Sequence, residues 1–364
     1  MRKVIDASHG EGGGQIIRTA VALAAVTRTE IELRNMRRGR SPSGLGRQHI
    51  AAVKAVAEIS DASVEGVSEG SERLVFEPNG VKGGRYEVDV GTAGSVSLVI
   101  QAVLPLAVRA ESEIRLSVRG GTDVRWSPTY DYLENVSLPL LRKAGVDADV
   151  ELGRRGYYPK GGGEVTLSVR PSRLTDVEIV RRGGLRRVRG ISHVSNLDDG
   201  IAERQATAAE KRLRSEIDDE VDIQIQRRSY DSFSTGTGIS LWAEFDETVM
   251  GGSSLGEMGK PAEEVGEEAA EDLLRSVRSD AAVDVYSGDQ LIPYIAVGGG
   301  KYTAPEETSH LQTNAWVCEQ LTGSDVETEE EEEDDYNRVV VSSESEPEPE
   351  PEPESGSLSP SEKT

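Results

Sequence analysis

The chain has 364 residues, which is enough for one large domain or two ordinary domains with a substantial core. No stretch of about eighteen uninterrupted apolar residues occurs, so the sequence predicts no membrane span and favours a soluble, cytoplasmic protein. The single cysteine, Cys318, can neither form an internal disulfide nor complete a zinc site with a second thiol.

The formal net charge of -24 is distributed unevenly along the chain. Residues 324–364 contain 16 acidic and 2 basic side chains, a net charge of -14, which leaves -10 for residues 1–323. Four arginines, in contrast, lie within residues 37–47. A local positive site on an acidic protein is therefore compatible with an anionic partner such as a nucleic acid.

The charged residues are also biased in type. Only 9 of the 41 basic residues are lysine, and 65 acidic residues accompany three phenylalanines. This halophilic composition is expected where high salt screens repulsion between surface charges, so our hypothesis is a salt-adapted cytoplasm. Unfolding midpoints measured in low and in molar KCl test it, and equal or greater stability at low salt would contradict it.

Strand-like and helix-like patterns alternate through residues 1–170, with glycine and aspartate at most junctions. The order strand, helix, strand, helix, strand, strand is followed by much the same order again, which indicates similar units in tandem. The predicted strands are 3–6, 30–35, 73–77, 86–90, 114–118, 146–152 and 164–169. The predicted helices are 15–26, 47–58, 95–108 and 129–144.

Residues 183–279 differ in character and predict a small inserted α/β domain. Several arginines open this segment, and a very polar helix and an acidic helix follow at 200–217 and 261–277. Beyond the insert, helices at 290–296 and 311–321 and a closing hairpin at Val326 and 338–341 predict a third unit that resembles the first two.

The predicted fold class is therefore α/β (α+β), with a large domain built from residues 1–182 and 280–342. Each of its three units is expected to pair two helices with a four-stranded sheet. Residues 343–364 form an acidic tail of Glu-Pro repeats whose only apolar residue is Leu358. Because this segment cannot bury enough apolar surface to offset its chain entropy, we expect it to be disordered.

The most informative N-terminal segment is the glycine-rich run at residues 10–15, GEGGGQ, which follows a predicted strand and precedes a predicted helix. Glycines allow the backbone to approach a ligand closely, and a helix N-terminus favours anions. A simple tight turn is the alternative. Neither the dinucleotide fingerprint nor the P-loop motif is present, and Glu11 in an anion loop is unexpected unless it serves a cation.

A second motif combines Arg37, Arg38 and Arg40 with Gly39, Ser41 and Pro42, shortly before a helix that begins with Arg47, Gln48 and His49. Arginine side chains bind phosphate through two parallel hydrogen bonds, so such a group predicts a strong anion site. Solvated surface charge is the alternative, and the interleaved glycine and proline favour a shaped loop.

A third motif places His310 at the start of the predicted C-terminal helix, directly after Thr308 and Ser309. A neutral imidazole is a competent nucleophile toward phosphorus at pH 7 without a separate base. A helix cap or an anion contact would explain the same position, and the position alone leaves these alternatives open.

Taken with further blocks, these motifs resemble the RNA 3'-terminal phosphate cyclase family. The resemblance covers residues 3–323, with only a weak match in the insert. Its blocks, in the family's order, are GEGGGQIIR at 10–18, RRGR at 37–40 with Gly44, RQH at 47–49, GGTD at 120–123, WSP at 126–128, RGYYPKGGG at 155–163, DQL at 289–291, His310, and TN at 313–314.

The resemblance implies three similar helix-and-sheet units interrupted by an insert, in agreement with the patterning. It also implies ATP, a divalent cation (Mg or Mn) and RNA 3'-phosphate ends as ligands. His310 matches the histidine that carries AMP, and Glu11 matches the metal-binding glutamate. The positions around the phosphates are Arg18, Arg37, Arg40 and Gln48, and those of the adenosine pocket are Gln101, Pro128, Tyr286, Asp289 and Gln290.

The implied reaction is an ATP-dependent conversion of an RNA 3'-phosphate to a 2',3'-cyclic phosphate through histidine-AMP and RNA-adenylate intermediates. A non-catalytic RNA-processing factor on the same fold is the main alternative, but such relatives lack the histidine. A sugar-phosphate transferase of similar repeated architecture, such as an enolpyruvyl transferase, is a third reading. It does not require Tyr286, Asp289 and His310 together.

Overall fold

The computed structural model describes residues 2–333 and 336–344. Three units share one topology, in which two parallel strands are joined through a helix and two further strands pair antiparallel. The first unit has the sheet order β1-β2-β4-β3. Its elements are β1 (Lys3–Asp6), α1 (Gly14–Thr27), β2 (Ile31–Arg34), α2 (Arg47–Ile59), β3 (Ser63–Glu65) and β4 (Leu74–Glu77).

The second unit repeats this arrangement with the sheet order β5-β6-β8-β7. Its strands are β5 (Gly84–Asp89), β6 (Ile114–Gly120), β7 (Ala148–Arg154) and β8 (Gly163–Val169). Its helical segments are α3 (Val96–Val103) with the 3-10 turn η1 (Leu104–Arg109), and α4 (Tyr130–Tyr132), η2 (Leu133–Ser137) and α5 (Leu138–Lys143) in succession.

The third unit has the order β9-β14-β16-β15, and the insert lies between its first strand and its first helix. Its elements are β9 (Val177–Ile179), α8 (Val285–Gly298), β14 (Gly300–Ala304), α9 (Ser309–Thr322), β15 (Val326–Glu333) and β16 (Tyr336–Ser343). β16 therefore ends at the residue where the predicted tail begins, and residues 345–364 of that tail lie outside the described residues.

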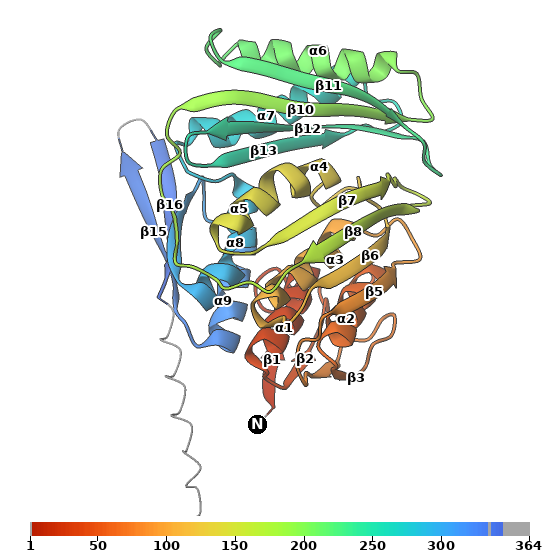
Figure 1. Cartoon of the computed structure of the whole chain (residues 1–364), viewed down its shortest axis with the longest axis vertical. Coiled ribbons are helices and arrows are strands. Elements are labelled where there is room, and N and C mark those ends of the chain that lie inside the picture. The colour runs from red at the N-terminus through yellow and green to blue at the C-terminus, as the bar shows by residue number, and fades with distance from the viewer. Residues whose placement is uncertain (1, 334–335, 345–364) are drawn as a thin grey trace, which may run out of the picture.

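The insert is a sheet of order β11-β10-β12-β13 covered by α6 and α7, and it lies at one end of the long axis (Figure 1). It has its own apolar core, to which Val188, Ile225 and Leu273 belong. Its elements are β10 (Leu185–Ser195), α6 (Gly200–Arg214), β11 (Asp222–Tyr230), β12 (Gly236–Phe245), β13 (Val249–Leu255) and α7 (Ala262–Arg278).

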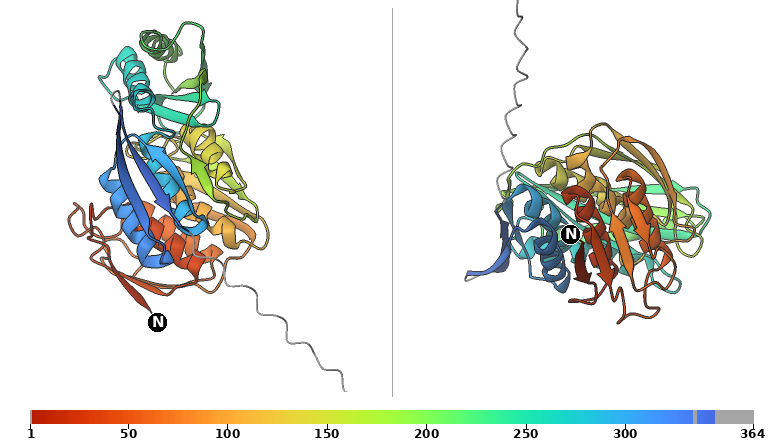
Figure 2. Two further views of the ribbon diagram at one scale, coloured as in Figure 1. Left: turned by 90° about the vertical axis from the view of Figure 1, so that its left-hand side faces the viewer. Right: turned by 90° about the horizontal axis from the view of Figure 1, so that it is seen from below.

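The helices of the three units pack against one another in the middle of the molecule, and the sheets lie outside them (Figure 2). α1 contacts both α2 and α9, and α8 contacts α9. Because α1 is packed on several sides, its residues from Ile16 to Val26 are buried except Arg18, which an amphipathic surface helix would not permit. This arrangement brings the amino ends of α1 and α9 together.

The predicted fold class is confirmed, and two predicted helices differ from the observed ones for the same reason. The predicted helix 129–144 contains a π-type turn before Pro139, and the predicted helix 95–108 changes to a 3-10 turn at Pro105. Proline has no N–H to donate, so the regular α-helical hydrogen bonds cannot continue through it. Within the described ranges, no helix has both the length and the apolar character needed to cross a membrane.

Candidate active site

The His310 imidazole lies where the amino ends of α1 and α9 meet. Thr308 caps α9 by accepting a hydrogen bond from the backbone N–H of Leu311. Nδ1 of His310 lies 2.6 Å from Oε1 of Gln15, and Nε2 lies 3.2 Å from Oε2 of Glu11. Because Oε1 can only accept, Nδ1 is the donor in that bond. Both nitrogens contact side chains, yet half of the His310 side chain is open to solvent, so a reactant can reach the ring.

The Glu11 carboxylate is shared among three neighbouring groups. In addition to the His310 contact, Oε1 accepts a hydrogen bond of 2.8 Å from the Ser309 hydroxyl, and Nη2 of Arg40 lies 3.4 Å from Oε2. About a quarter of the Glu11 side chain is exposed. The carboxylate is therefore accessible to a cation, and Mg²⁺ commonly binds through only one or two protein carboxylates together with water and substrate phosphates.

The glycine-rich run allows the start of α1 to approach both neighbouring helices. Gly10 has a φ of 58°, and a Cβ there would lie 2.3 Å from the Thr313 hydroxyl oxygen. A Cβ on Gly14 would lie 2.1 Å from Nε2 of His49. No side chain caps the helix at Gly13, so the first N–H groups of α1 stay available to an anion. The tight turn therefore leaves these N–H groups open, and the anion loop stays a prediction.

A half-buried cation, Arg18, stands beside a neutral histidine behind this loop. The backbone N–H of Gly46 donates to Nδ1 of His49 over 3.1 Å. Burial, followed by the charges of Arg18 and Arg37, lowers the pKa of His49 to about 3. Burial lowers the pKa of Arg18 to about 10, so this guanidinium is still charged at neutral pH. The charged Arg18 guanidinium makes the place favourable for phosphate.

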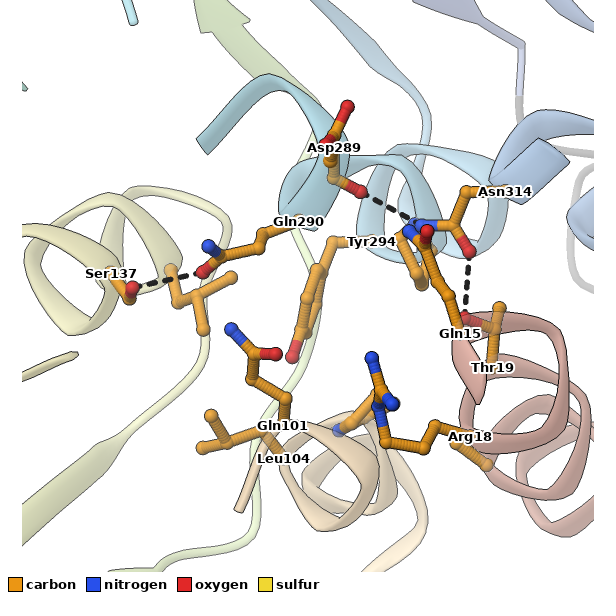
Figure 3. A pocket seen from close by; sticks show the side chains of 14 residues that line it. Gln15, Arg18, Thr19, Gln101, Leu104, Ser137, Asp289, Gln290, Tyr294 and Asn314 are labelled. Atoms are coloured by element: carbon orange, nitrogen blue, oxygen red, sulfur yellow. Dashed lines mark hydrogen bonds between the residues drawn. The ribbon is translucent and has the colours of Figure 1, made fainter. Parts of the chain in front are cut away.

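A pocket opens next to these groups, between α1, α3, α5, α8 and α9 (Figure 3). Asn314 accepts a hydrogen bond from Thr19 over 2.6 Å and donates to the backbone oxygen of Asp289 over 2.8 Å. The side-chain nitrogen of Gln101 is buried and has no hydrogen-bond partner among the residues that the structure describes. The lining comprises Gln15, Arg18, Thr19, Ala22, Gln101, Leu104, Pro105, Ser137, Leu141, Asp289, Gln290, Pro293, Tyr294 and Asn314.

The Asp289 carboxyl group has an unusual protonation equilibrium in this pocket. Burial raises its pKa from 3.8 to about 7, and the nearby carboxylates Asp284, Glu11 and Glu306 act in the same direction. A hydrogen bond of 2.5 Å donated by the Thr308 hydroxyl partly opposes that rise. Asp289 therefore changes charge near neutral pH, and a ligand that donates hydrogen bonds would favour its ionised form.

The structure brings most of the predicted site residues together in two groups. Arg18, Gln101, Asp289 and Gln290 line the pocket, and Glu11, Arg40 and His310 are linked by the contacts around the Glu11 carboxylate.

Two further predicted phosphate residues hold backbone groups instead. Oε1 of Gln48 accepts a hydrogen bond of 2.8 Å from the N–H of Ser95, and Nη1 of Arg37 donates to the carbonyl oxygen of Gly44 over 2.8 Å. Both side chains therefore shape the loops around the arginines.

Pro128 and Tyr286 do not line this pocket. Pro128 precedes Thr129, which caps α4. The Tyr286 hydroxyl donates to Asp272 of the insert. Tyr286, Asp289 and Gln290 are three and four residues apart on α8, so they share one side of that helix.

The structure adds Gln15 and Asn314, which stood inside the sequence motifs without an assigned role. Asn314 lies four residues after His310 on α9, a spacing that places two side chains on one helix face. That spacing was a usable signal in the sequence. The contact between Gln15 and His310 joins residues 295 positions apart, and no local pattern could have revealed it.

A second cluster of metal-binding residue types lies elsewhere, at the boundary between the second unit and the insert. Among the described residues, Asp123, Asp131 and His193 are close enough to share a metal ion. However, the buried Arg155 donates to Asp123 over 2.9 Å and to Asp131 over 2.7 Å. Because one guanidinium already compensates both carboxylates, these three residues form a salt bridge within the second unit. His193 of the insert lies against it, with Nε2 3.3 Å from Nη1 of Arg155.

Comparison with known proteins places this geometry in context. The family model described as RNA 3'-terminal phosphate cyclase matches residues 9–328. The chain is similar to the RNA 3'-terminal phosphate cyclase of Pyrococcus furiosus, with 45% identity over 90% of this chain and 95% of the relative. The corresponding protein of Methanopyrus kandleri is 47% identical over 89% of this chain and 94% of the relative. That of Archaeoglobus fulgidus is 46% identical, over 89% and 97% respectively. The chain belongs to the RNA 3'-terminal phosphate cyclase family.

Proposed function

We propose that this protein is a cytoplasmic enzyme that uses ATP to convert RNA 3'-terminal phosphates into 2',3'-cyclic phosphates, with His310 as the residue that carries AMP. The observation that carries the proposal is the setting of His310. Its Nδ1 is engaged by Gln15, and its Nε2 faces the carboxylate of Glu11 at an exposed position next to a polar pocket. Family membership supplies the reaction class.

In the first step, Nε2 of His310 forms a bond to the α-phosphorus of ATP, and the bond from that phosphorus to the pyrophosphate oxygen breaks. The Nδ1–H bond to Gln15 stabilises the positive charge that the ring gains. An oxygen of the RNA 3'-phosphate then attacks the same phosphorus and releases His310. Finally the RNA 2'-hydroxyl attacks the terminal phosphate, AMP leaves, and the hydroxyl proton passes to solvent.

The phosphate groups would bind at the amino end of α1. Arg18 supplies a half-buried positive charge there, and Arg40 approaches from the loop before α2, where it contacts Glu11. Gln48 and Arg37 act through the backbone groups that they hold. Removal of one charge-assisted phosphate contact generally costs about 1.5 to 3 kcal/mol, so the two arginines should dominate the binding of RNA ends.

The adenosine of ATP would occupy the pocket between α1, α3 and α8. The unpartnered nitrogen of Gln101 offers a donor to a base, and the Asp289 carboxylate offers an acceptor to a ribose hydroxyl. Gln290 lines this pocket from α8, whereas Tyr286 and Pro128, which we also assign to adenosine, lie outside its lining. Buried polar atoms without partners are rare in proteins, so the Gln101 amide favours a polar ligand here.

A divalent cation, Mg or Mn, would be held by Glu11 and would supply charge neutralisation to the leaving pyrophosphate. The donor set fits a weakly held ion, because Glu11 contributes one partly exposed carboxylate among hydroxyl and imidazole neighbours.

The test is incubation of the purified protein with ATP labelled at the α-phosphate, followed by mass spectrometry of the labelled peptide. An acid-labile AMP adduct on His310, absent from His310→Ala, is the expected result. An adduct that maps to a lysine such as Lys160, or no adduct with active ATP and metal, would overturn the assignment.

A further inference from the structure

Three exposed aromatic side chains stand apart from the site described above. Trp126 is 92% exposed, Tyr158 79% and Phe233 57%. The chain contains only three tryptophans and three phenylalanines, and one of each is exposed to solvent. Large aromatic side chains are usually buried, so their exposure here needs an explanation. We call these three residues the aromatic patch.

The loops that carry the aromatic patch come from both domains and are joined by direct contacts. The N–H of Thr122 donates to the carbonyl oxygen of Gly156 over 2.8 Å, which ties the loop of Trp126 to that of Tyr158. The N–H of Lys160 lies 3.2 Å from the Ser234 hydroxyl oxygen, which ties the loop of Tyr158 to that of Phe233. The patch is therefore formed only when the insert is docked on the second unit.

Two cations accompany the aromatic rings. The guanidinium of Arg154 lies 4.5 Å from the centre of the Phe233 ring, in the geometry of a cation–π contact. Neither Arg154 nor Lys160 forms an ion pair with any described residue. In a chain with a net charge of -24, cations that lack acidic partners beside exposed rings favour an anionic ligand that also has flat apolar groups.

The aromatic patch is connected to the phosphate site by a short series of contacts. A Cβ on Gly161 would lie 2.6 Å from the carbonyl oxygen of Thr92, so the loop of Tyr158 lies directly against residues 91–94. The next residue, Ser95, donates its N–H to Gln48 at the start of α2. An extended ligand whose end lies at the arginines can thus continue across this surface to the patch.

We propose that the aromatic patch binds the bases of single-stranded RNA upstream of the 3'-phosphate. The bases stack on Trp126, Tyr158 and Phe233, while Arg154 and Lys160 contact the backbone phosphates. Every base has a flat face and can stack on an aromatic ring, so the patch has no sequence preference. It increases the affinity for RNAs that are long enough to reach it. The inference rests on the proposed function because the RNA end must lie near His310.

The experiment compares two 3'-phosphorylated RNAs, of 3 and 12 nucleotides, that share the same 3' sequence. In the full-length protein, Trp126→Ala, Tyr158→Ala and Phe233→Ala are each expected to raise the KM for the 12-nucleotide RNA about tenfold. The KM for the 3-nucleotide RNA and the rate of AMP-adduct formation should stay unchanged. Val4→Ala, which alters an exposed apolar residue on β1, is the matched control, and Phe233→Tyr should retain most of the affinity.

Equal changes for both RNAs, or no change for the 12-nucleotide RNA, would overturn the proposal. So would a wild-type dimer that the patch variants dissociate, since a second copy of the chain would then be the occupant. A separate measurement does not depend on catalysis: a 12-nucleotide RNA should quench the fluorescence of Trp126, and Trp126→Phe should lack that quench. If no AMP adduct forms but RNA still quenches the fluorescence, the proposed reaction is wrong while the proposed RNA-binding surface is supported.

Discussion

The hydroxyl of Tyr286 donates a hydrogen bond of 3.0 Å to Asp272, and this bond runs from α8 of the large domain to α7 of the insert. The other oxygen of Asp272 accepts from the backbone N–H of Ser253. The Tyr286 ring also meets the ring of Tyr132 edge-on, with centroids 6.1 Å apart. The insert therefore fixes the orientation of the tyrosine that we assign to adenine.

Tyr286→Phe retains the ring and removes this hydrogen bond, so it should weaken ATP binding by about two- to tenfold. Tyr286→Ala removes the ring as well and should weaken binding further. Calorimetric titration with ATP measures both effects. Equal affinities of the Phe and Ala variants would show that the ring contributes nothing to ATP binding.

His310→Ala and His310→Asn should abolish the AMP adduct and cyclisation from ATP while leaving the melting temperature nearly unchanged. The side chain is half exposed, and the pocket residues Gln101 and Asp289 are still in place to bind nucleotide. A supplied RNA with a pre-adenylated end already has an activated phosphate, so the variants should retain part of the closing step. Normal adduct formation by either variant would show that His310 does not carry AMP and has only a structural role.

Arg40→Ala should impair the use of RNA 3'-phosphate roughly ten- to hundredfold while affecting AMP-adduct formation less. Arg37→Ala should act in the same direction, but partly through the loop that it holds at Gly44. Arg38→Ala is the matched control, because Arg38 is exposed and its side chain makes one long hydrogen bond within the described part of the chain, to Asn35 over 3.4 Å. Separate assays of adduct formation and of RNA turnover measure the two steps. Equal loss in both assays would place Arg40 in the ATP site.

The raised pKa of Asp289 predicts a pH dependence of stability with a definite sign. The folded protein holds this proton up to about pH 7, and the unfolded chain releases it near 3.8. The free energy of unfolding therefore contains a contribution from this proton that is complete below pH 3.8. That contribution is lost as the pH rises to 7, by at most about 1.4 kcal/mol per pH unit. Asp289→Asn should therefore become more stable relative to wild type between pH 5 and 7, as measured by urea unfolding. Parallel stability curves would contradict the raised pKa.

Two truncations test where the folded C-terminus ends. Deletion of residues 345–364 should leave the melting temperature and cyclisation nearly intact, because the segment has so little apolar surface. Deletion of residues 339–364 removes the buried Val339 and Val341 from β16 and should cost about 3 to 6 kcal/mol. Calorimetric melting distinguishes the two. A large loss from the shorter deletion would show that the acidic segment contributes to the fold.

Strongly periodic elements were predictable from the sequence. The predicted helices 15–26 and 47–58 differ from α1 and α2 by one residue at most at each end, since uninterrupted apolar spacing defines them. The strands of the insert were not predicted. β11 carries Gln224, Gln226 and Arg228 on its exposed side, and its pairing with β10 holds this polar segment in the sheet.

The candidate site was also only partly predictable from the sequence. The motifs that contain Glu11 and His310 stood out because glycines and a rare histidine are visible one residue at a time. The role of Gln48 was harder to predict, because its side chain accepts a hydrogen bond from the N–H of Ser95, which lies 47 positions later in the chain. The contact of Tyr286 with Asp272 depends on how the insert is docked, and no local pattern encodes such docking.

The position of the insert also determines when the third unit can be completed during synthesis. Val177 of β9 pairs with Gly300 of β14, and the whole insert lies between them in the chain. As the chain leaves the ribosome, β9 has no parallel partner until more than 100 further residues have been made. The first two units contain all their own strands and can fold earlier, so the helix that carries His310 joins a framework that has already formed.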